Sequence, residues 1–140
     1  MLAIESKTGI AKGSQETVYN YVSDFRNFSG LLPQDRLNNL KITQEKIIFD
    51  IQGLGTIGLE IREKQPWSML TVGASKDSSA DFTFIINISE SEKDLSEVKL
   101  KLNANLNMFL EMMARNPLQQ FVDLMVDKLS LVNFDKKEES

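Results

Sequence analysis

The sequence predicts an α+β fold in which a curved antiparallel sheet of about seven strands wraps a long C-terminal helix, with two short helices after the first strand. Three observations predict it: residues 38–113 alternate between apolar and polar positions, polar or glycine-bearing breaks divide them, and the last apolar stretch has helical spacing. Breaks this short favour antiparallel neighbours. The chain has 140 residues, so we expect one domain over residues 1–134 and a charged tail over 135–140.

The first part of the chain predicts a strand followed by helices. Apolar residues within the segment 2–13 indicate a short strand. Ser14 is a suitable helix N-cap, and apolar residues then recur at helical spacing, which predicts a helix over roughly residues 14–28. Residues 31–36 contain a proline and favour a second, short helical turn before the sheet begins.

The middle of the chain predicts six strands. Each has apolar residues at every second position, so each has one face suited to burial. At ~3.3 Å per residue the last of these strands would span roughly 50 Å, and a strand of that length has to bend. The expected strands lie near residues 38–43, 46–52, 55–64, 67–75, 80–90 and 96–113.

A final amphipathic helix is expected over about residues 117–132. Asn116 and Pro117 fit the N-cap and the first helical position, and Gln119 completes a pattern like a capping box. From Leu118 onward the apolar residues follow i, i+3, i+4, i+7 spacing, so this helix needs a large apolar partner. The concave face of the predicted sheet is the one surface large enough.

Composition narrows the possible functions. The net charge of −4, without clustered Lys or Arg, disfavours nucleic acid as a partner. Without cysteine or histidine, the chain can form no disulfide, no thiolate or histidine metal site and no histidine-based catalytic triad. Residues 1–7 lack the apolar core of a signal peptide, and no run of ~18 apolar residues predicts a membrane span. We therefore expect a cytoplasmic protein with no cofactor and no metal.

A glycine pattern at residues 53–58 raises the possibility of nucleotide binding. The pattern matches the GxGxxG string that holds a pyrophosphate in dinucleotide-binding units. That mechanism requires a helix after the glycines, whereas Ile57, Leu59 and Ile61 alternate as in a strand. We therefore interpret the segment as a glycine-eased hairpin or bulge.

The order of the elements resembles the START-like superfamily, also called SRPBCC, which includes the birch pollen allergen relatives; the chain looks like a bacterial-type member. The resemblance covers essentially the whole chain. It rests on residues 14–28 followed by Leu32-Pro33, on the strand 57–63 running into Pro66-Trp67, and on the passage from strand to helix through Asn116-Pro117. It implies a helix-grip fold, in which the sheet wraps the last helix and leaves an internal cavity beneath it. Members commonly bind lipids, sterols, polyketides or other apolar molecules there, some catalyse cyclase or hydrolase chemistry, and others contact chaperones or have no known ligand.

Three functions remain open. The leading hypothesis is non-enzymatic binding of a hydrophobic small molecule or lipid in that cavity. The first alternative is a cavity enzyme of cyclase, dehydratase or hydrolase type that uses an inward carboxylate or tyrosine. The second is a protein-interaction module, such as a homodimer, with a contiguous exposed patch formed by Ile48, Ile85, Phe109 and Met113.

The residues expected to line the cavity are apolar residues on the buried faces of the strands and of the final helix. No residue is assigned a catalytic role. The cavity residues are Phe49, Ile51, Leu59, Ile61, Leu70, Phe82, Phe84, Leu100, Leu102, Leu106, Met108, Phe121 and Met125.

Other conspicuous side chains have simpler interpretations. Met108, Met112, Met113 and Met125 form a methionine cluster, for which filling of core gaps is favoured over a wall that adapts to a ligand. Alternation places Asn103, Asn105 and Asn107 on a solvated outer face. It also places Asp50, Glu60 and Arg62 outward, where they are expected to be surface charges.

Overall fold

The structure, a computed structural model, describes residues 2–32, 35, 37–51, 55–132 and 134. Within these residues the chain forms eight strands, three α-helices and one 3-10 turn. In chain order these are β1 (Leu2–Glu5), β2 (Gly9–Ala11), α1 (Gln15–Val22), α2 (Phe25–Phe28), η1 (Ser29–Leu31), β3 (Asn38–Ile42), β4 (Lys46–Ile51), β5 (Gly55–Gln65), β6 (Met69–Ala74), β7 (Asp81–Glu92), β8 (Leu95–Asn105) and α3 (Met108–Leu131).

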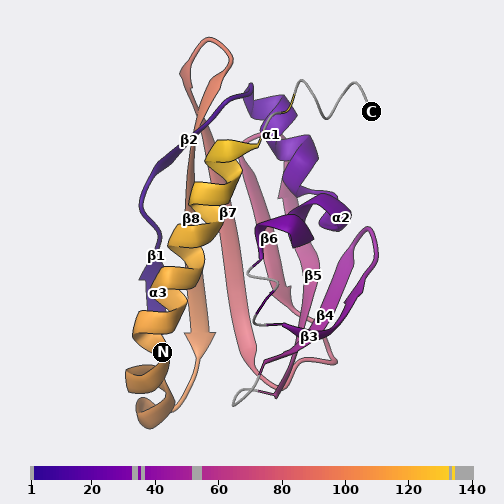
Figure 1. Cartoon of the computed structure of the whole chain (residues 1–140), viewed down its shortest axis with the longest axis vertical. Helices are drawn as coiled ribbons and strands as arrows, with labels where there is room; N and C mark the ends of the chain where they lie inside the picture. Colours follow the sequence, from indigo (N-terminus) through magenta and orange to yellow (C-terminus); the bar gives the residue numbers. More distant parts are fainter. Residues whose placement is uncertain (1, 33–34, 36, 52–54, 133, 135–140) are drawn as a thin grey trace.

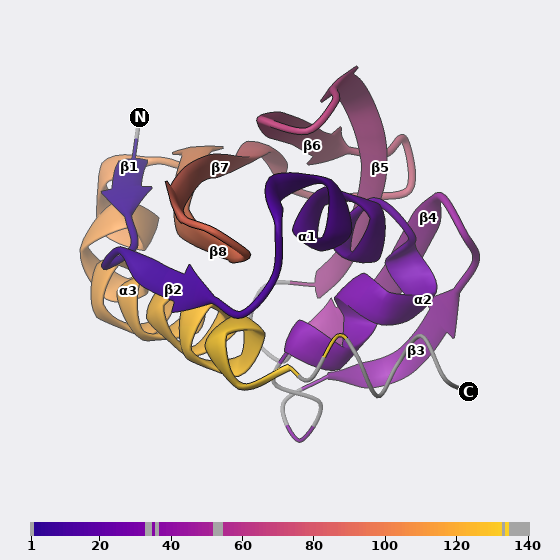
Figure 2. The ribbon, with the colours of Figure 1, turned by 90° about the horizontal axis from the view of Figure 1, so that it is seen from above.

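All strands belong to one antiparallel sheet with the order β1-β8-β7-β6-β5-β4-β3, and β2 also pairs with β8. Figures 1 and 2 show a strongly curved sheet whose concave side holds the helices, with α3 running along β8 and β1. The predicted fold class is therefore confirmed. The core lies between this concave face and the helices, and residues such as Phe25, Leu70 and Met125 are fully buried there.

The first predicted strand is divided into two. Ser6 lies between β1 and β2 and is buried, and its Oγ accepts a hydrogen bond from the Leu100 amide at 2.8 Å. The Lys7 amide donates to Asp123 Oδ1 of α3 at 2.8 Å, so the chain turns from the sheet toward the helix at this point. The sheet accordingly has eight strands, one more than expected.

The first predicted helix is also divided. Ser14 is the N-cap of α1 as expected, with its Oγ accepting from the Thr17 amide at 3.2 Å. Asp24 then caps α2 by accepting from the Arg26 amide at 3.0 Å, which begins a second helix within the predicted range 14–28. The expected short turn appears as η1, slightly earlier than predicted, and residues 33–34 and 36 lie outside the described residues.

The predicted junction between the last strand and the last helix is wrong. β8 ends at Asn105 and α3 begins at Met108, so the alternating residues 108–113 are helical. The N-cap is Asn107, whose Oδ1 accepts from the Leu110 amide at 2.9 Å, while Asn116 and Pro117 lie within α3. The physical reason is pairing: in the described residues, β1 and β7 reach β8 only as far as the pairs Leu2↔Ala104 and Asp81↔Asn105. A longer strand would leave its backbone without partners.

The glycine segment behaves as expected in its described part. Gly53 lies outside the described residues, and β5 begins at Gly55, which has a φ of +86°. A strand rather than a helix follows the glycines, so the pyrophosphate mechanism has no helix N-terminus to use.

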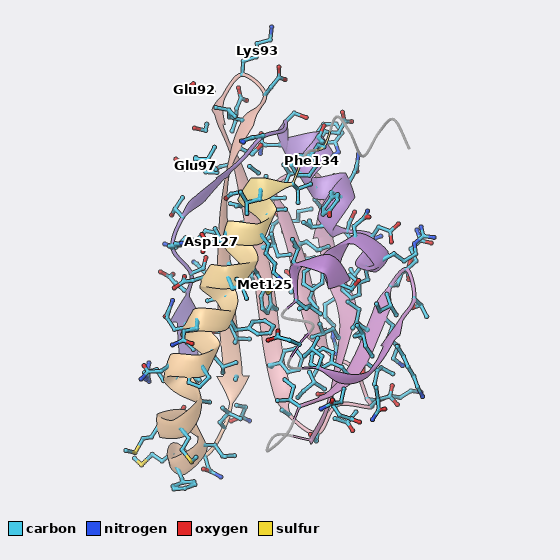
Figure 3. The ribbon with its side chains drawn as sticks, in the orientation of Figure 1. Glu92, Lys93, Glu97, Met125, Asp127 and Phe134 are labelled. Carbon is cyan, nitrogen blue, oxygen red and sulfur yellow. The ribbon has the colours of Figure 1, made fainter. Side chains whose placement is uncertain are left out.

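Several contacts hold α3 against the sheet and the N-terminal segment. A Cβ at Gly9 would overlap Val126 Cγ1, so β2 approaches α3 more closely than any other residue type would allow. The Lys128 ammonium donates to the Leu32 carbonyl at 3.0 Å. Figure 3 shows Met125 on the side of α3 that faces the sheet and Phe134 beside α1, where its ring meets Tyr21 at a centroid distance of 5.3 Å. No helix in the described part of the chain has the length and apolarity needed to cross a membrane.

Candidate functional site

An apolar pocket of about 110 Å³ lies between the concave face of the sheet and α3. Fifteen described residues line it, and all of them are apolar. The strand alternation supplies most of the wall, because every second side chain of β4, β5, β7 and β8 points toward α3. Cross-strand pairs continue the wall across the sheet: Phe49 opposes Ile57, and Phe84 opposes Leu102.

Eight of the thirteen residues predicted to line a cavity lie on the wall of this pocket. Seven of them come from β4, β5, β7, β8 and α3, as the alternation and the helical spacing indicated, and Leu106 lies between β8 and α3. Their role in holding a ligand stays a prediction. These residues are Phe49, Ile51, Leu59, Phe82, Phe84, Leu102, Leu106 and Phe121.

The other five predicted residues lie away from the pocket. Leu70, Leu100 and Met125 are buried in parts of the core where helix and sheet pack together. Ile61 is half-buried next to a register shift in the pairing of β5 with β6. Met108 was placed wrongly, because it begins α3 instead of ending β8, and it is 78% exposed.

The prediction of a methionine cluster is also wrong, because it assumed that β8 continues through residues that belong to α3. Only Met125 of its four members is buried, whereas Met108, Met112 and Met113 are on the exposed side of the first turns of α3. Among the asparagines, Asn105 is exposed and Asn103 half-buried, and Asn107 is the cap of α3.

Seven wall residues were missed by the sequence reasoning. Phe28 and Leu32 come from the segment after α1, and the Phe28 ring meets the Phe84 ring edge-on at 6.4 Å. Phe28 was expected on the first helix and Leu32 in the short turn that follows it, and neither expectation indicates that the side chain faces this pocket. Ala80 lies in the loop before β7, Ala104 on β8 and Ala114 on α3, and all three face the space. Because each side chain ends at Cβ, together they leave it unfilled. The remaining two are Ile57 and Leu118.

The mouth of the pocket is marked by its half-buried wall residues. Ile51 ends β4, Phe82 is the second residue of β7, and Leu106 lies between β8 and α3. Leu118 and Phe121 lie on α3. The opening therefore lies at the end of the sheet where α3 begins, which is the lower end of the molecule in Figure 1.

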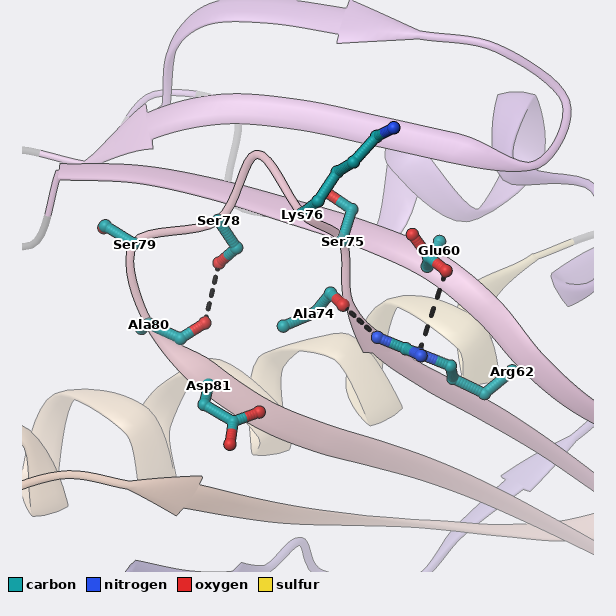
Figure 4. Close-up of a pocket in the computed structure, with 9 residues that line it drawn as sticks. All are labelled: Glu60, Arg62, Ala74, Ser75, Lys76, Ser78, Ser79, Ala80 and Asp81. Atoms are coloured by element: carbon teal, nitrogen blue, oxygen red, sulfur yellow. Dashed lines mark hydrogen bonds and ion pairs between the residues drawn. The ribbon is translucent and has the colours of Figure 1, made fainter.

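A larger, polar cleft of about 560 Å³ lies on the outer face of the sheet, with α3 behind it (Figure 4). It is wide open to solvent, and its polar groups largely satisfy one another. Arg62 lies 3.8 Å from Glu60 Oε2 and also donates to the Ala74 carbonyl, and Ser78 Oγ donates to the Ala80 carbonyl at 2.8 Å. The buried Ser75 Oγ has no hydrogen-bond partner in the part of the chain that the structure describes. Because the apolar pocket removes a ligand from water and the cleft does not, we take the pocket as the candidate site.

The predicted outward charges lie where alternation placed them. Glu60 and Arg62 pair on the outer face. Asp50 accepts hydrogen bonds from Asn39 Nδ2 and Thr56 Oγ1, each at 2.8 Å. These bonds, that from Asn39 first, hold the pKa of the Asp50 carboxyl below its ordinary value.

Comparisons with known proteins give a consistent answer for the fold. No family model matches the chain, and no curated protein matches it. Among solved structures, the protein XoxI from Bacillus cereus matches with a TM-score of 0.73 at 15% identity, covering 98% of this chain and 99% of that one. A protein from Thermus thermophilus matches with a TM-score of 0.72 at 12% identity, covering 99% and 100%. A START superfamily protein from Mycobacterium smegmatis matches with a TM-score of 0.65 at 14% identity, covering 94% and 99%.

The chain has the START-like fold. In this START-like fold, a cavity enzyme would require an acidic, basic or phenolic side chain on the pocket wall. The described wall residues include no carboxylate and no tyrosine. Tyr19 on α1 has a buried hydroxyl, and burial raises its pKa, but it does not line the pocket. Nowhere in the described ranges do three carboxylates gather as a metal site would require.

The predicted dimer patch is not contiguous in the START-like fold. Ile48 and Ile85 are half-buried on the outer face of β4 and β7, with β5 and β6 between them. Phe109 and Met113 lie on α3, which covers the opposite face of the sheet. The error follows from the misplaced junction, since these two residues were taken as part of a strand.

Proposed function

We propose that this protein binds a hydrophobic small molecule, or the apolar end of a lipid, in the pocket beneath α3. The observation that carries the proposal is the composition of the wall, in which all fifteen described side chains are apolar and five are phenylalanines. Transfer of an apolar group from water into such a pocket is favourable, so it stabilises the complex.

The size of the pocket limits the part of the ligand that it can hold. An apolar cavity of ~150 Å³ accommodates a benzene ring, so the smaller space of about 110 Å³ suits a chain end, or a ring that lies partly in the mouth. At roughly 27 Å³ per packed carbon the pocket holds about four methylene groups, which contribute about 3 kcal/mol before the cost of association is subtracted. We therefore expect binding no tighter than the millimolar range, unless α3 moves outward to admit a longer chain.

The wall also limits the chemistry of the ligand. Among the described wall residues no side chain can donate a hydrogen bond to a head group, so selection by the wall rests on size and shape. A polar head group would cost free energy inside and would remain at the mouth, between Leu106 and Phe82. The expected ligand is thus a molecule with at least one slender apolar end.

Two measurements test this function. Native mass spectrometry of freshly purified protein, followed by organic extraction, is expected to release a defined apolar molecule where α3 moves outward to hold a longer chain, because a ligand bound in the millimolar range is lost during purification. A titration of the purified chain with toluene, followed by methyl NMR, is expected to give saturable shifts at Leu59, Leu102 and Leu106, which line the pocket.

The matched control for the titration is Leu131, which is 79% exposed at the far end of α3 and should show no saturable shift. Equal shifts at Leu131 and Leu102 would indicate nonspecific contact. Absence of any saturable shift at the three wall leucines in the folded protein would refute the proposed function.

A further inference from the structure

The first turns of α3 carry an exposed apolar surface. Met108, Phe109, Met112 and Met113 are 78%, 69%, 80% and 62% exposed. Their i, i+1, i+4, i+5 spacing places them on one side of the helix, and we call them the α3 tip. Fully exposed, a large apolar side chain presents on the order of 150–200 Å², so the α3 tip exposes on the order of 500 Å², a patch size that is often functional.

The α3 tip borders the mouth of the apolar pocket. Leu106, which immediately precedes the cap of α3, lines the pocket, and so does Ala114, which immediately follows the tip. The same two turns of helix therefore present one side to the pocket and the other to solvent. A partner that covers the tip would lie beside the entrance through which a ligand has to pass.

The shape of the α3 tip favours a soft partner over a second copy of the chain. In Figure 1 the first turns of α3 project beyond the ends of β1 and β8, and in Figure 3 sulfur atoms project from this end of the helix. A stable protein interface buries about 800 Å² per partner, more than the tip offers. Unbranched methionine side chains adapt readily to an irregular surface such as the boundary of acyl chains.

Charge indicates which lipid surface would fit. The chain has a net charge of −4, and the only charged residues among the first eight positions of α3 are Glu111 and Arg115, one of each sign. The tip therefore lacks the basic cluster that attracts proteins to anionic lipids. Electrostatics favour a zwitterionic surface over an anionic one.

We propose that the protein docks on a zwitterionic lipid bilayer through the α3 tip, with Met108, Phe109, Met112 and Met113 inserted at the boundary of head groups and acyl chains. Docking places the pocket mouth at the membrane surface, so an apolar ligand passes between bilayer and pocket without crossing water. This last step rests on the proposed function, whereas the docking surface itself does not.

The test is flotation of the full chain with phosphatidylcholine vesicles. The double variant Met112→Gln, Met113→Gln is expected to lower the partition coefficient at least tenfold, because two apolar side chains no longer leave water. Leu131→Gln is the matched control, since Leu131 is as exposed as the tip residues but lies at the opposite end of α3; it should change partition less than twofold. Adding phosphatidylglycerol should not increase binding.

Three results would overturn the docking proposal: no flotation of the parent chain, equal flotation of the parent and the double variant, or a parent dimer in sedimentation that the double variant converts to a monomer. The last would assign the tip to self-association. The toluene titration separates this proposal from the proposed function. If toluene binds but the vesicles do not, only docking is wrong; if the vesicles bind but toluene does not, the pocket function is wrong and the docking surface stands.

Discussion

Filling the pocket from α3 tests the free space beneath the helix most directly. Ala114 is 8% exposed and its methyl group lies on the pocket wall. The substitution Ala114→Leu adds three carbon atoms, which occupy on the order of 80 Å³ in a packed interior. The pocket of about 110 Å³ can hold them without displacing its neighbours.

The expected free-energy change follows from transfer of those atoms out of water. Three buried carbons contribute about 2.4 kcal/mol, and fixing the leucine rotamer costs about 0.5–1 kcal/mol. We therefore expect Ala114→Leu to raise the free energy of unfolding by about 1–2 kcal/mol. In a site without free space, the same change would lower it by about 1–3 kcal/mol through overpacking, so the sign of the effect decides.

Urea unfolding followed by far-UV circular dichroism measures this change, with an unchanged slope as the check that both chains unfold to the same extent. The matched control is Ala11→Leu, because Ala11 is completely buried on β2 and does not line the pocket. The control should be destabilised. A loss of stability in Ala114→Leu as large as that in Ala11→Leu would refute the reasoning, and so would undiminished toluene shifts in Ala114→Leu.

Three further predictions concern the wall, the cap of α3 and an outer-face carboxylate. Leu100→Ala should cost about 2–5 kcal/mol of stability and Leu102→Ala distinctly less, because Leu102 borders a space that already exists; equal losses in urea unfolding would count against the pocket. Asn107→Ala should lower the free energy of unfolding by about 1 kcal/mol, while Asn116→Ala should leave it nearly unchanged. A lower melting temperature for Asn116→Ala than for Asn107→Ala would instead indicate that the helix begins at Asn116. The pKa of the Asp50 carboxyl is lower in the folded chain than in the unfolded chain, so the ionised carboxylate stabilises the fold above the unfolded pKa of about 3.8, and this stabilisation is lost as the pH falls through the folded pKa. The difference in free energy of unfolding between the parent and Asp50→Asn should therefore shrink below about pH 4. A difference that grows below pH 4 would contradict the lowered pKa of Asp50.

Local sequence patterns predicted those features that depend only on residues close in the sequence. The alternation in β7 and β8 predicted which side chains face inward, because a strand at the centre of a sheet always has one face to bury. Ser14 was identified as a cap because its partner, Thr17, lies three residues away. Both features depend on residues a few positions apart, so the sequence alone is enough to predict them.

The junction before α3 could not be predicted in the same way. Residues 106–113 alternate as a strand would, and both Asn107 and Asn116 are chemically suited to cap a helix. The choice depends on where β1 and β7 stop pairing with β8, which is a property of strands distant in sequence. Because of this error, three of the four methionines that were expected to fill core gaps lie instead on the exposed α3 tip.

By itself, the sequence determined the class of fold, the buried face of most strands and the apolar character of the residues beneath the last helix, because these follow from periodicity and side-chain chemistry. Only the tertiary structure decided that the space there is not filled. Ala80, Ala104 and Ala114 are ordinary small residues in the sequence, separated by tens of positions or by a change of element. They leave a pocket because the curvature of the sheet and the start of α3 bring three short side chains to face the same space.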